Sequence, residues 1–412
     1  MKKIILKMNM YALMLVVAAG LSLTGCNDNP DAFVLTAGKP TISYIRIPDI
    51  LKSDSLITHA FMGTTIAIMG ENMTSVKEIW FNDQPTILNT SVITSSTIIV
   101  PVPEGIPVDV TNKIYFITKD GDTVTYDFKV DVPAPVIASM NCEQLADGDI
   151  AILVGDYFLN DPNIPLEVIF PGNVKATNII SIAKKEIKVQ VPVGSQRGRI
   201  DVKSLYGNGR AKFVFRDNRN VILDFDTKFG AGWRAGKVFN TDPAGITGSY
   251  VRLTGHLKNN SDWVEDDLAC ELWGQSAGLP EGPLFEGKPE DMVIKFEAYV
   301  VNPWKAGYLQ MIFSPWNNST NAPNGNQEMA RGFWRPWEGA KDGTYQSEGW
   351  ITVTIPLKQF IYNPDGSVAT LKLKTENLGS LTLFVWGGGN DKLGAECDVK
   401  ICIDNVRIVP QE

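Results

Sequence analysis

The sequence predicts an all-β protein made of several β-sandwiches, and three observations lead to this prediction. Short segments alternate apolar and polar side chains or are rich in β-branched residues, as in TTIAIMG, DIAILVG and KEIKVQVPVG. This is the pattern of strands that cover a core with one face. Turn sequences such as KDGD, YGNG and NPDG separate these segments. Beyond the apolar N-terminal run, no convincing amphipathic helix is found, and the 412 residues suffice for two to four domains.

The first 25 residues have the form of a secretory signal peptide. Early lysines precede an apolar run, MYALMLVVAAGLSL, which is too short and too close to the terminus to be a working membrane span. The run ends in LTGC, which resembles the lipobox of bacterial lipoproteins. The alternative is an ordinary signal peptide followed by a chance cysteine. We expect residues 1–25 to be removed and Cys26 to carry acyl chains that attach the protein to a membrane.

The segment behind this cysteine is polar and acidic. Residues 27–31 read NDNPD, which resembles the export tag that sends Bacteroidetes lipoproteins to the outer face of the outer membrane. We therefore expect residues 26–39 to be a lipidated cysteine with a tether. The expected location is the cell outer membrane, with the protein lipid-anchored and facing outward.

Charge and composition exclude several classes of protein. The formal net charge is -8 and no basic run is present, so a nucleic-acid-binding surface is not expected. Two histidines, His59 and His256, fall in different predicted domains, which leaves no material for a catalytic triad or a histidine-rich metal site. Besides Cys26, four cysteines lie far apart without CxxC spacing, so we expect free thiols and no zinc site. A disulfide between Cys270 and a C-terminal cysteine stays open, because export permits disulfides.

Two consecutive stretches share an order of landmarks. The first opens with PTISYI at Pro40 and continues through GENM, IWF, IIVPVP and IYFITKDG; the second opens with PAPVIASM and continues through GDYF, VIF, IKVQVPVG and IDVKSLYGNG. In each, alternating strands face a core, glycine makes a turn and the VP step closes an edge strand. This order resembles the IPT/TIG immunoglobulin-like domain. We expect one such domain over residues 40–132 and a second over residues 133–217, both acting as spacers.

The tryptophans are concentrated in the last part of the chain. Nine of the ten lie between Trp233 and Trp386. Trp233 and Trp263 occupy turn-rich polar stretches and stay open between core and surface. Four others stand beside proline and polar residues at a strand end or in a loop: Trp304, Trp316, Trp334 and Trp337. Rigid exposed indoles offer much contact area for little lost side-chain freedom, as a carbohydrate-binding platform requires, with Arg335 as a partner for sugar hydroxyls. The alternative is that these indoles fill the core.

Residues 218–412 resemble a known family through a series of elements. These are VILDFDTKFGAGW, VIKFEAYVVNPWKAGYLQMIF, RPW followed by GWITVTIPLKQF, and a closing ICIDNVRIV strand. They are similar to the C-terminal glycan-binding domain of Bacteroidetes surface glycan-binding proteins. The resemblance implies a larger, jelly-roll-like C-terminal β-sandwich that binds glycans, with a platform at Trp304 and at Trp334 or Trp337. Where relatives often have an aromatic residue directly before the second tryptophan, this chain has Pro336.

The same resemblance implies a setting and partners. The family consists of cell-surface lipoproteins of polysaccharide utilisation systems. They carry immunoglobulin-like domains in front of the binding domain. The implied partners are a polysaccharide, a TonB-dependent transporter complex and a surface glycosidase. A β-glucan is the first expectation, because flat chains suit a planar platform, while mannans and xylans remain open.

An enzyme of sandwich fold is the main alternative. A retaining glycosidase needs two carboxylates about 5 Å apart. The best stretch is WVEDDLACE, in which alternation would place Glu265, Asp267 and Glu271 on one strand face. Sandwich glucanases use a tighter E-x-D-x-E or E-x-D-x-x-E arrangement, which is absent here. We therefore expect no enzyme and no catalytic residue, and keep a glycoside hydrolase and a structural adhesin as alternatives.

No cofactor is expected. A structural calcium ion is the one open possibility, because sandwich carbohydrate modules often hold one near their first and last strands. Asp224, Asp226 and Asp404 lie in such segments, and their oxygen atoms are donors that suit calcium. Three acids distant in sequence are more typical of a solvated surface, so no metal ligand is assigned. The predicted function is thus non-catalytic capture of a polysaccharide for delivery to an outer-membrane uptake system.

Overall fold

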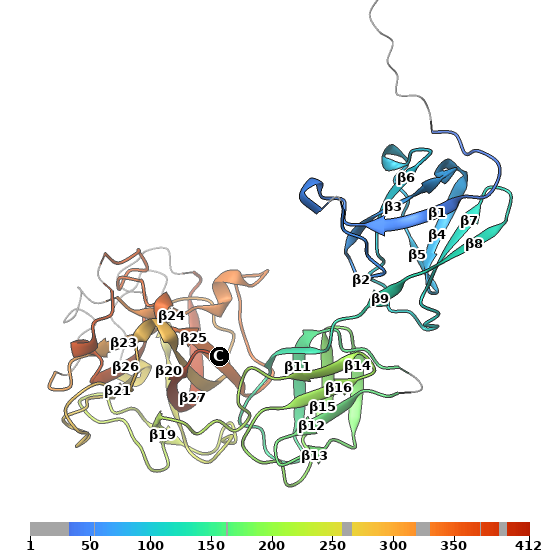
Figure 1. Ribbon diagram of the computed structural model, residues 1–412. Coiled ribbons are helices and arrows are strands. Elements are labelled where there is room, and N and C mark those ends of the chain that lie inside the picture. Colours follow the sequence, from blue (N-terminus) through green and yellow to red (C-terminus); the bar gives the residue numbers. More distant parts are fainter. Residues whose placement is uncertain are drawn as a thin grey trace, which may run out of the picture. The chain divides into compact units, whose positions relative to one another are not determined.

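A computed structural model describes residues 33–52, 54–161, 164–257, 266–318, 330–370, 372–386 and 394–412. The predicted signal peptide, Cys26, Trp263 and Glu265 lie outside these residues. The described chain consists of β-strands joined by turns and short 3-10 helices, so the prediction of an all-β protein is confirmed (Figure 1). Within this part of the chain, no helix is long and apolar enough to cross a membrane.

The chain divides into two compact units, and the first ends at Val132. It contains a three-stranded sheet of order β1-β3-β6, a four-stranded sheet of order β5-β4-β7-β8 and a parallel pair β2-β9. Alternate residues of the two larger sheets, such as Ile66, Ile68, Ile79 and Phe116, fill the core between them. The elements are β1 (Thr41–Arg46), η1 (Ile50–Lys52), β2 (His59–Phe61), β3 (Thr65–Glu71), η2 (Met73–Ser75), β4 (Val76–Phe81), β5 (Gln84–Thr86), η3 (Thr90–Val92), β6 (Thr97–Pro101), β7 (Lys113–Thr118), β8 (Thr123–Asp127) and β9 (Lys129–Asp131).

The second unit, residues 133–412, begins with another sandwich of two four-stranded sheets. Their orders are β10-β11-β15-β14 and β13-β12-β16-β17, and a core that includes Ile137, Leu153, Val168 and Ile187 lies between them. The strands are β10 (Val136–Met140), β11 (Ile150–Asp156), β12 (Glu167–Phe170), β13 (Val174–Lys175), β14 (Ile179–Ala183), β15 (Glu186–Gln190), β16 (Asp201–Ser204) and β17 (Gly207–Arg210).

The repeated glycines of the first two sandwiches have a role other than the predicted turn. Gly70 and Gly155 are each the next-to-last residue of a strand that pairs with the first strand of its sandwich across a register shift. A Cβ atom on Gly70 would lie 2.0 Å from the carbonyl oxygen of Thr41, and one on Gly155 would lie 1.8 Å from that of Val136. Any side chain would collide with the neighbouring backbone. Glycine is therefore required for close strand approach.

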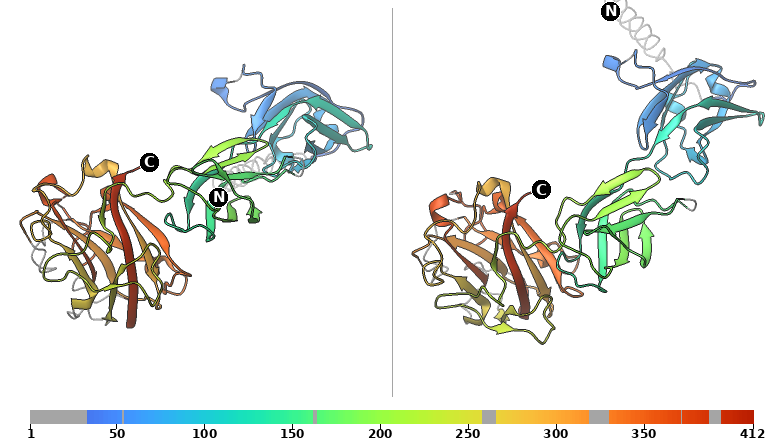
Figure 2. Two further views of the ribbon diagram at one scale, coloured as in Figure 1. Left: turned by 90° about the horizontal axis from the view of Figure 1, so that it is seen from below. Right: turned by 60° about the horizontal axis from the view of Figure 1, so that its bottom comes forward.

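The C-terminal sandwich has one sheet of six strands and one of four. The first has the order β19-β20-β27-β22-β25, with β18 also paired to β27, and the second has the order β21-β26-β23-β24. The long last strand, β27, runs along the whole first sheet (Figure 2). The elements are β18 (Val221–Leu223), β19 (Val238–Phe239), β20 (Tyr250–Leu257), η4 (Asp266–Leu268), β21 (Ala269–Leu272), η5 (Pro289–Asp291), β22 (Met292–Val300), β23 (Tyr308–Ser314), β24 (Gly332–Trp334), η6 (Pro336–Gly339), β25 (Ile351–Pro356), η7 (Leu357–Gln359), η8 (Thr375–Asn377), β26 (Ser380–Trp386) and β27 (Cys397–Pro410).

The second and third sandwiches meet through a buried ionic network. Arg407 of β27 donates two hydrogen bonds to Glu297 of β22, at 2.8 and 3.1 Å, and a third at 2.9 Å to Glu143 of the second sandwich. Lys295 donates to the other oxygen of Glu143 at 2.6 Å. Burial opposes the charge on Arg407, but Glu297 and Glu143 raise the pKa of its guanidinium overall. Two acids and two bases thus compensate one another inside the protein, and they join the two sandwiches.

The cysteines in the described part of the chain are free thiols. Cys142, Cys270 and Cys402 are buried, and Cys397 is half-buried. Burial raises the pKa of Cys270 to about 12, so this thiol is inert at neutral pH. The disulfide left open for Cys270 is not formed.

Candidate functional site

The four-stranded sheet of the C-terminal sandwich has one face toward the core and one face outward. Trp334 of β24 lies opposite Leu309 of β23, and its ring contacts Phe296 of the other sheet, with centroids 5.7 Å apart. This contact identifies the core side. Because side chains alternate along a strand, the neighbours of these two residues point outward. The outer face thus carries Tyr308 and Gln310 of β23, together with their cross-strand partners Phe333, Phe384 and Trp386.

Four rings of the outer face and its margin form an aromatic row. Tyr308 stacks on Phe333 with ring centroids 4.9 Å apart, and Phe333 stacks on Tyr362 at the same distance. Trp337 lies on the other side of Tyr308, 6.2 Å away and only 4° from parallel. Its indole N–H donates to the carbonyl oxygen of Gly307 at 2.8 Å. We call Trp337, Tyr308, Phe333 and Tyr362 the aromatic row; Tyr362 is half-buried and the other three rings are buried.

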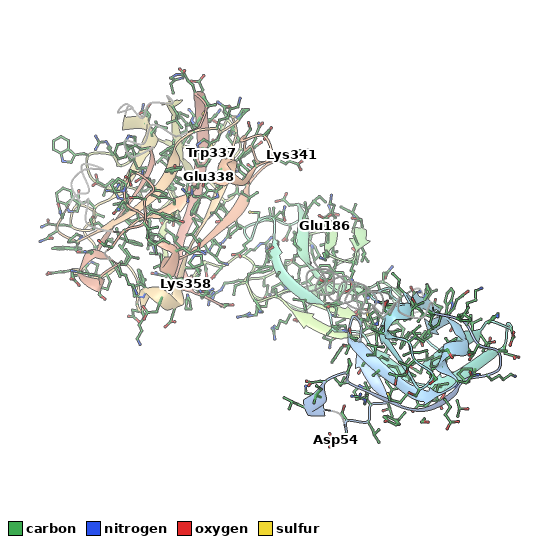
Figure 3. The ribbon with its side chains drawn as sticks, turned by 90° about the horizontal axis from the view of Figure 1, so that it is seen from above. Asp54, Glu186, Trp337, Glu338, Lys341 and Lys358 are labelled. Atoms are coloured by element: carbon green, nitrogen blue, oxygen red, sulfur yellow. The ribbon has the colours of Figure 1, made fainter. Side chains whose placement is uncertain are left out.

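Arg335 lies across this row. Its guanidinium carbon is 4.9 Å from the centre of the Tyr362 ring, 5.3 Å from that of Tyr308 and 5.9 Å from that of Phe333, within the range of cation–π attraction. Its Nε also pairs with Glu338 at 2.8 Å, and the two side chains keep 25% and 49% of their surface exposed. The outer margin of the row therefore presents the Arg335 guanidinium, which the rings hold in place, and the Glu338 carboxylate, which is paired with it. Figure 3 shows Trp337 and Glu338 side by side in this sandwich.

Polar groups continue beside the row. Gln310 is fully buried and donates through Nε2 to the carbonyl oxygens of Pro364 and Trp386, both at 3.1 Å. Its Oε1 accepts a hydrogen bond from Arg331 at 2.9 Å. Burial lowers the pKa of Arg331 to about 10. Burial also raises the pKa of the Tyr308 hydroxyl, as does the nearby Glu338, while Arg335 acts in the opposite direction. At neutral pH the Tyr308 hydroxyl is therefore neutral.

The structure separates the four predicted platform tryptophans. Trp304 is fully buried; its indole donates to the carbonyl oxygen of Ala306, and its ring packs on Trp334, 5.5 Å away. Trp334 is half-buried on the core side of the sheet, where its ring also meets Tyr345. The prediction that these two indoles stand exposed on one surface is therefore wrong for Trp304, whose backbone pairs with Tyr345 and directs its ring inward.

Trp337 and Trp316 also differ from the prediction. Trp337 keeps only 7% of its surface exposed, because η6 begins at Pro336 and turns the indole back against Tyr308 and the backbone of Gly394. Trp316 is half-buried beyond the far end of β23, and its indole donates to the carbonyl oxygen of Leu279 at 2.8 Å. The structure joins Trp337 and Arg335 in one site and leaves Trp304, Trp334 and Trp316 outside it.

Three residues of the row were missed by sequence reasoning. Tyr308 and Phe333 lie in strands that look like core strands, and only the register of β24 on β23 shows which side chains point outward. Tyr362 reaches the row because its backbone pairs with Arg331, 31 residues earlier. The usable signal was alternation in YLQMIF, which separates Tyr308 and Gln310 from their apolar neighbours.

The expected carboxylate line of a glycosidase does not form in the described residues. Asp267 lies in η4, before the strand β21, and pairs with Lys237 at 2.6 Å. Glu271 is buried on β21 and accepts a hydrogen bond from the backbone N–H of Trp233. The prediction that alternation aligns them on one strand is wrong, because the chain turns at η4.

The three aspartates considered for calcium have protein partners. Asp224 accepts hydrogen bonds from the backbone N–H groups of Asp226, Thr227 and Lys228, which closes a tight turn. Asp404 is buried and accepts a hydrogen bond from the Thr247 hydroxyl at 2.7 Å. Among the described residues, no group of three or more His, Cys, Asp or Glu side chains is arranged to hold a metal ion.

Comparisons with known proteins place this chain in a family. A family model described as the surface glycan-binding protein B xyloglucan binding domain matches residues 215–410. The crystal structure of the surface glycan-binding protein PbSGBP-B from Prevotella bryantii is 33% identical in sequence with a TM-score of 0.77, over 92% of this chain and 100% of its own. The chain belongs to the surface glycan-binding protein B family. Proteins of this family bind glycans and are not enzymes, which confirms the resemblance and the absence of catalysis predicted above.

Other relatives are more distant or match only in part. An IPT/TIG domain-containing protein of Bacteroides ovatus is 30% identical over 156 residues, which are 36% of this chain and 30% of that relative. The chain thus matches less than a third of the length of this curated relative. An SGBP-B from a complex xyloglucan utilization locus in Bacteroides uniformis is 15% identical over 91% of this chain and all of its own, with a TM-score of 0.47.

Proposed function

We propose that this member of the family captures a β-glucan chain without cleaving it, through Arg335 and the aromatic row of the C-terminal sandwich. The observation that carries the proposal is a guanidinium fixed over three rings beside a half-exposed carboxylate. Sugar hydroxyls need donors and acceptors in fixed positions, and sugar C–H groups pack against an aromatic ring. Arg335 and Glu338 supply the first, and the part of the half-buried Tyr362 that stays exposed supplies the second.

The buried rings have a supporting part in this proposal. Tyr308 and Phe333 hold the guanidinium in one orientation, and Trp337 packs against Tyr308. Little side-chain freedom is therefore lost when a sugar binds. A single shallow site of this kind fits an affinity on the order of micromolar to millimolar. Many copies on one cell surface would raise the effective affinity for a long polymer.

Location and partners belong to the same proposal. Acyl chains on Cys26 would hold the protein on the outer face of the outer membrane, and residues 27–39 would serve as a tether. The captured chain would pass to a TonB-dependent transporter complex and a surface glycosidase. Xyloglucan leads among the candidate ligands, because the family model that matches residues 215–410 is named for a xyloglucan binding domain.

Affinity electrophoresis of residues 27–412 tests the proposal. The gels would contain xyloglucan, barley β-glucan, laminarin, mannan or xylan, with Arg335→Ala beside the wild type and Lys188→Ala as a control on the second sandwich. We expect the wild type to be retarded in at least one β-glucan, Arg335→Ala to be retarded much less, and Lys188→Ala to be retarded as strongly as the wild type. Unretarded wild-type protein in every gel would contradict glycan capture and favour the adhesin alternative.

A further inference from the structure

A depression that is separate from the aromatic row opens on the C-terminal sandwich, between its two sheets. It lies between residues 227–231 and the loop of residues 279–286, with Leu272 of β21 at its base, and has a volume of about 710 Å³. A volume of this size is typical of small-molecule sites. We call this depression the edge groove. The aromatic row contributes no residue to its lining.

Backbone hydrogen bonds fix the first wall of the edge groove. The Asp224 carboxylate accepts from the N–H groups of the following turn and so holds Lys228 in place. Three residues later, the N–H of Ala231 donates to the carbonyl oxygen of Glu271 at 2.8 Å, and the carbonyl oxygen of Ala231 accepts from Trp273 at 2.8 Å. Phe229 stands between these two anchors. The backbone at Phe229 is therefore held in place before any ligand binds.

The opposite wall is fixed as firmly. The N–H of Leu284 donates to the carbonyl oxygen of Leu378 at 2.8 Å, and the side-chain amide of Asn220 donates to the carbonyl oxygen of Leu284 at 3.2 Å. Trp316 holds Leu279 through its indole N–H. Pro280 and Pro283 restrict the loop further. Trp316, expected from the sequence to stack on a sugar, instead supports this wall.

The chemistry of the groove suits a sugar. Phe229 lines it with 50% of its surface exposed, so part of the ring is open to a ligand. Glu281 and Glu286 are exposed on the loop, and Asn220 and Thr227 add polar groups on the other side. A pyranose unit has C–H groups on its face and hydroxyls around its edge. It therefore fits a site with one aromatic ring face and carboxylate acceptors around that ring.

The edge groove is remote from the aromatic row. Trp316, which supports the groove, follows the end of β23, whereas Tyr308 of the row begins this strand. A strand of seven residues spans roughly 20 Å. The two sites also lie toward opposite edges of the sheet, since β21 and β24 are its outermost strands. A short oligosaccharide bound to the row does not reach the groove.

We infer that the edge groove is a second glycan subsite, which takes a pyranose unit of the same polysaccharide against Phe229. The inference rests on the proposed function. Two subsites on one domain engage one long chain together, and the second contact forms at a high effective concentration. The groove therefore raises the affinity for polymer more than the affinity for short oligosaccharides.

Isothermal titration calorimetry on residues 27–412 tests this inference. The probes are xyloglucan and the short oligosaccharides that an endoglucanase releases from it, or the glucan and its fragments selected by electrophoresis. The proteins are wild type, Phe229→Ala, Phe229→Tyr as the conservative control, Arg335→Ala and the Phe229→Ala/Arg335→Ala double variant. Circular dichroism melting curves confirm that each variant is folded.

We expect Phe229→Ala to bind polymer about three- to tenfold more weakly and the short oligosaccharide within about twofold of wild type. Phe229→Tyr keeps the wild-type behaviour, and the weak binding left in Arg335→Ala disappears in the double variant. Equal polymer affinity of folded Phe229→Ala and wild type would overturn the subsite while leaving the proposed function intact. Wild-type protein that binds no glucan of any length would instead overturn the proposed function.

Discussion

The two outer faces of the C-terminal sandwich differ in what they carry. On the six-stranded sheet, Lys295, Glu297 and Arg407 point outward, and all three are buried by the second sandwich through Glu143. On the four-stranded sheet, the outward positions of β23 and its neighbours carry rings and amides, with Arg335 at the margin. Both faces hold an arginine, yet Arg407 is fully buried among carboxylates whereas Arg335 keeps a quarter of its surface exposed.

This difference teaches how charge is used on the two faces. A buried guanidinium needs opposite charges close by, and the resulting network fixes one arrangement of the two sandwiches. A guanidinium over aromatic rings is held by weaker attraction, and a quarter of the Arg335 side chain stays exposed to a ligand. One face thus sets the orientation of the binding domain, and the other is the face that we propose meets the glycan. Substitutions on the two faces should separate stability from binding.

The largest effect is expected on the buried face. Arg407→Ala leaves the buried Glu297 without its ion-pair partner and leaves Glu143 with Lys295 alone, and the free energy of unfolding should fall by about 3–5 kcal/mol. Urea unfolding followed by tryptophan fluorescence measures this, since nine of the ten tryptophans lie in the C-terminal sandwich segment. Arg210→Ala, at an exposed pair with Asp201, is the matched control and should cost less than about 1 kcal/mol. Similar losses in both variants would contradict a special role for the network.

A smaller loss is expected between the sheets, at Trp304. Trp304→Phe removes part of a fully buried ring and its hydrogen bond to Ala306, and should cost about 2–3 kcal/mol of unfolding free energy, less than truncation to alanine. Because Trp304 does not reach the outer face, glycan affinity should stay within about twofold of wild type. Affinity electrophoresis and urea unfolding on one preparation measure both. A large loss of glycan binding with unchanged stability would contradict this account and indicate that Trp304 belongs to the binding surface.

Asp404 should make stability depend on pH. Burial, opposed in part by the hydrogen bond from Thr247, raises its pKa from 3.8 to about 7. The folded state therefore holds this proton more tightly than the unfolded state. The contribution of Asp404 to the free energy of unfolding is fully present below about pH 4 and is lost as pH rises to about 7. Between pH 5 and 8 the wild type should lose roughly 2 kcal/mol, whereas Asp404→Asn should lose less. Parallel pH profiles of the two proteins would refute this titration.

The smallest free-energy change is expected on the outer face, at Arg335. Arg335→Ala should weaken glycan binding about tenfold, or about 1.4 kcal/mol, with less than about 0.5 kcal/mol of unfolding free energy lost. Arg335→Lys keeps the charge but not the planar donors, so the glycan affinity of this variant should lie between those of the wild type and Arg335→Ala. Calorimetric titration of the three proteins measures this order. A lysine variant equal to wild type would show that charge alone acts here.

Much of the fold follows from the sequence, because alternation and turn signals operate over a few residues. The glycines of GENM and GDYF could be located, but their contact with the carbonyl oxygens of Thr41 and Val136 depends on strand pairing. The site depends on pairing still more. Phe333 and Trp334 are neighbours in sequence, and the register of β24 sends one outward and the other to the core.

Proline beside a tryptophan proved a poor guide to exposure. Pro303 and Pro336 both precede tryptophans that are buried. Backbone pairing with Tyr345 directs the Trp304 ring inward, and η6, which begins at Pro336, does the same for Trp337. Tyr362 joins the row through a contact with Phe333 across 29 residues, which no local pattern encodes. Arg335 was predicted as a partner for sugar hydroxyls, and this role stays a prediction. The structure places three rings beside its guanidinium, which the sequence did not indicate.

A crystal structure of residues 27–412 with the oligosaccharide selected by electrophoresis tests the central claim most directly. The account predicts sugar hydroxyls within hydrogen-bonding distance of Arg335 and Glu338, with a sugar face against Tyr362. Sugar bound elsewhere on the sandwich, with Arg335 and the aromatic row unoccupied, would contradict it.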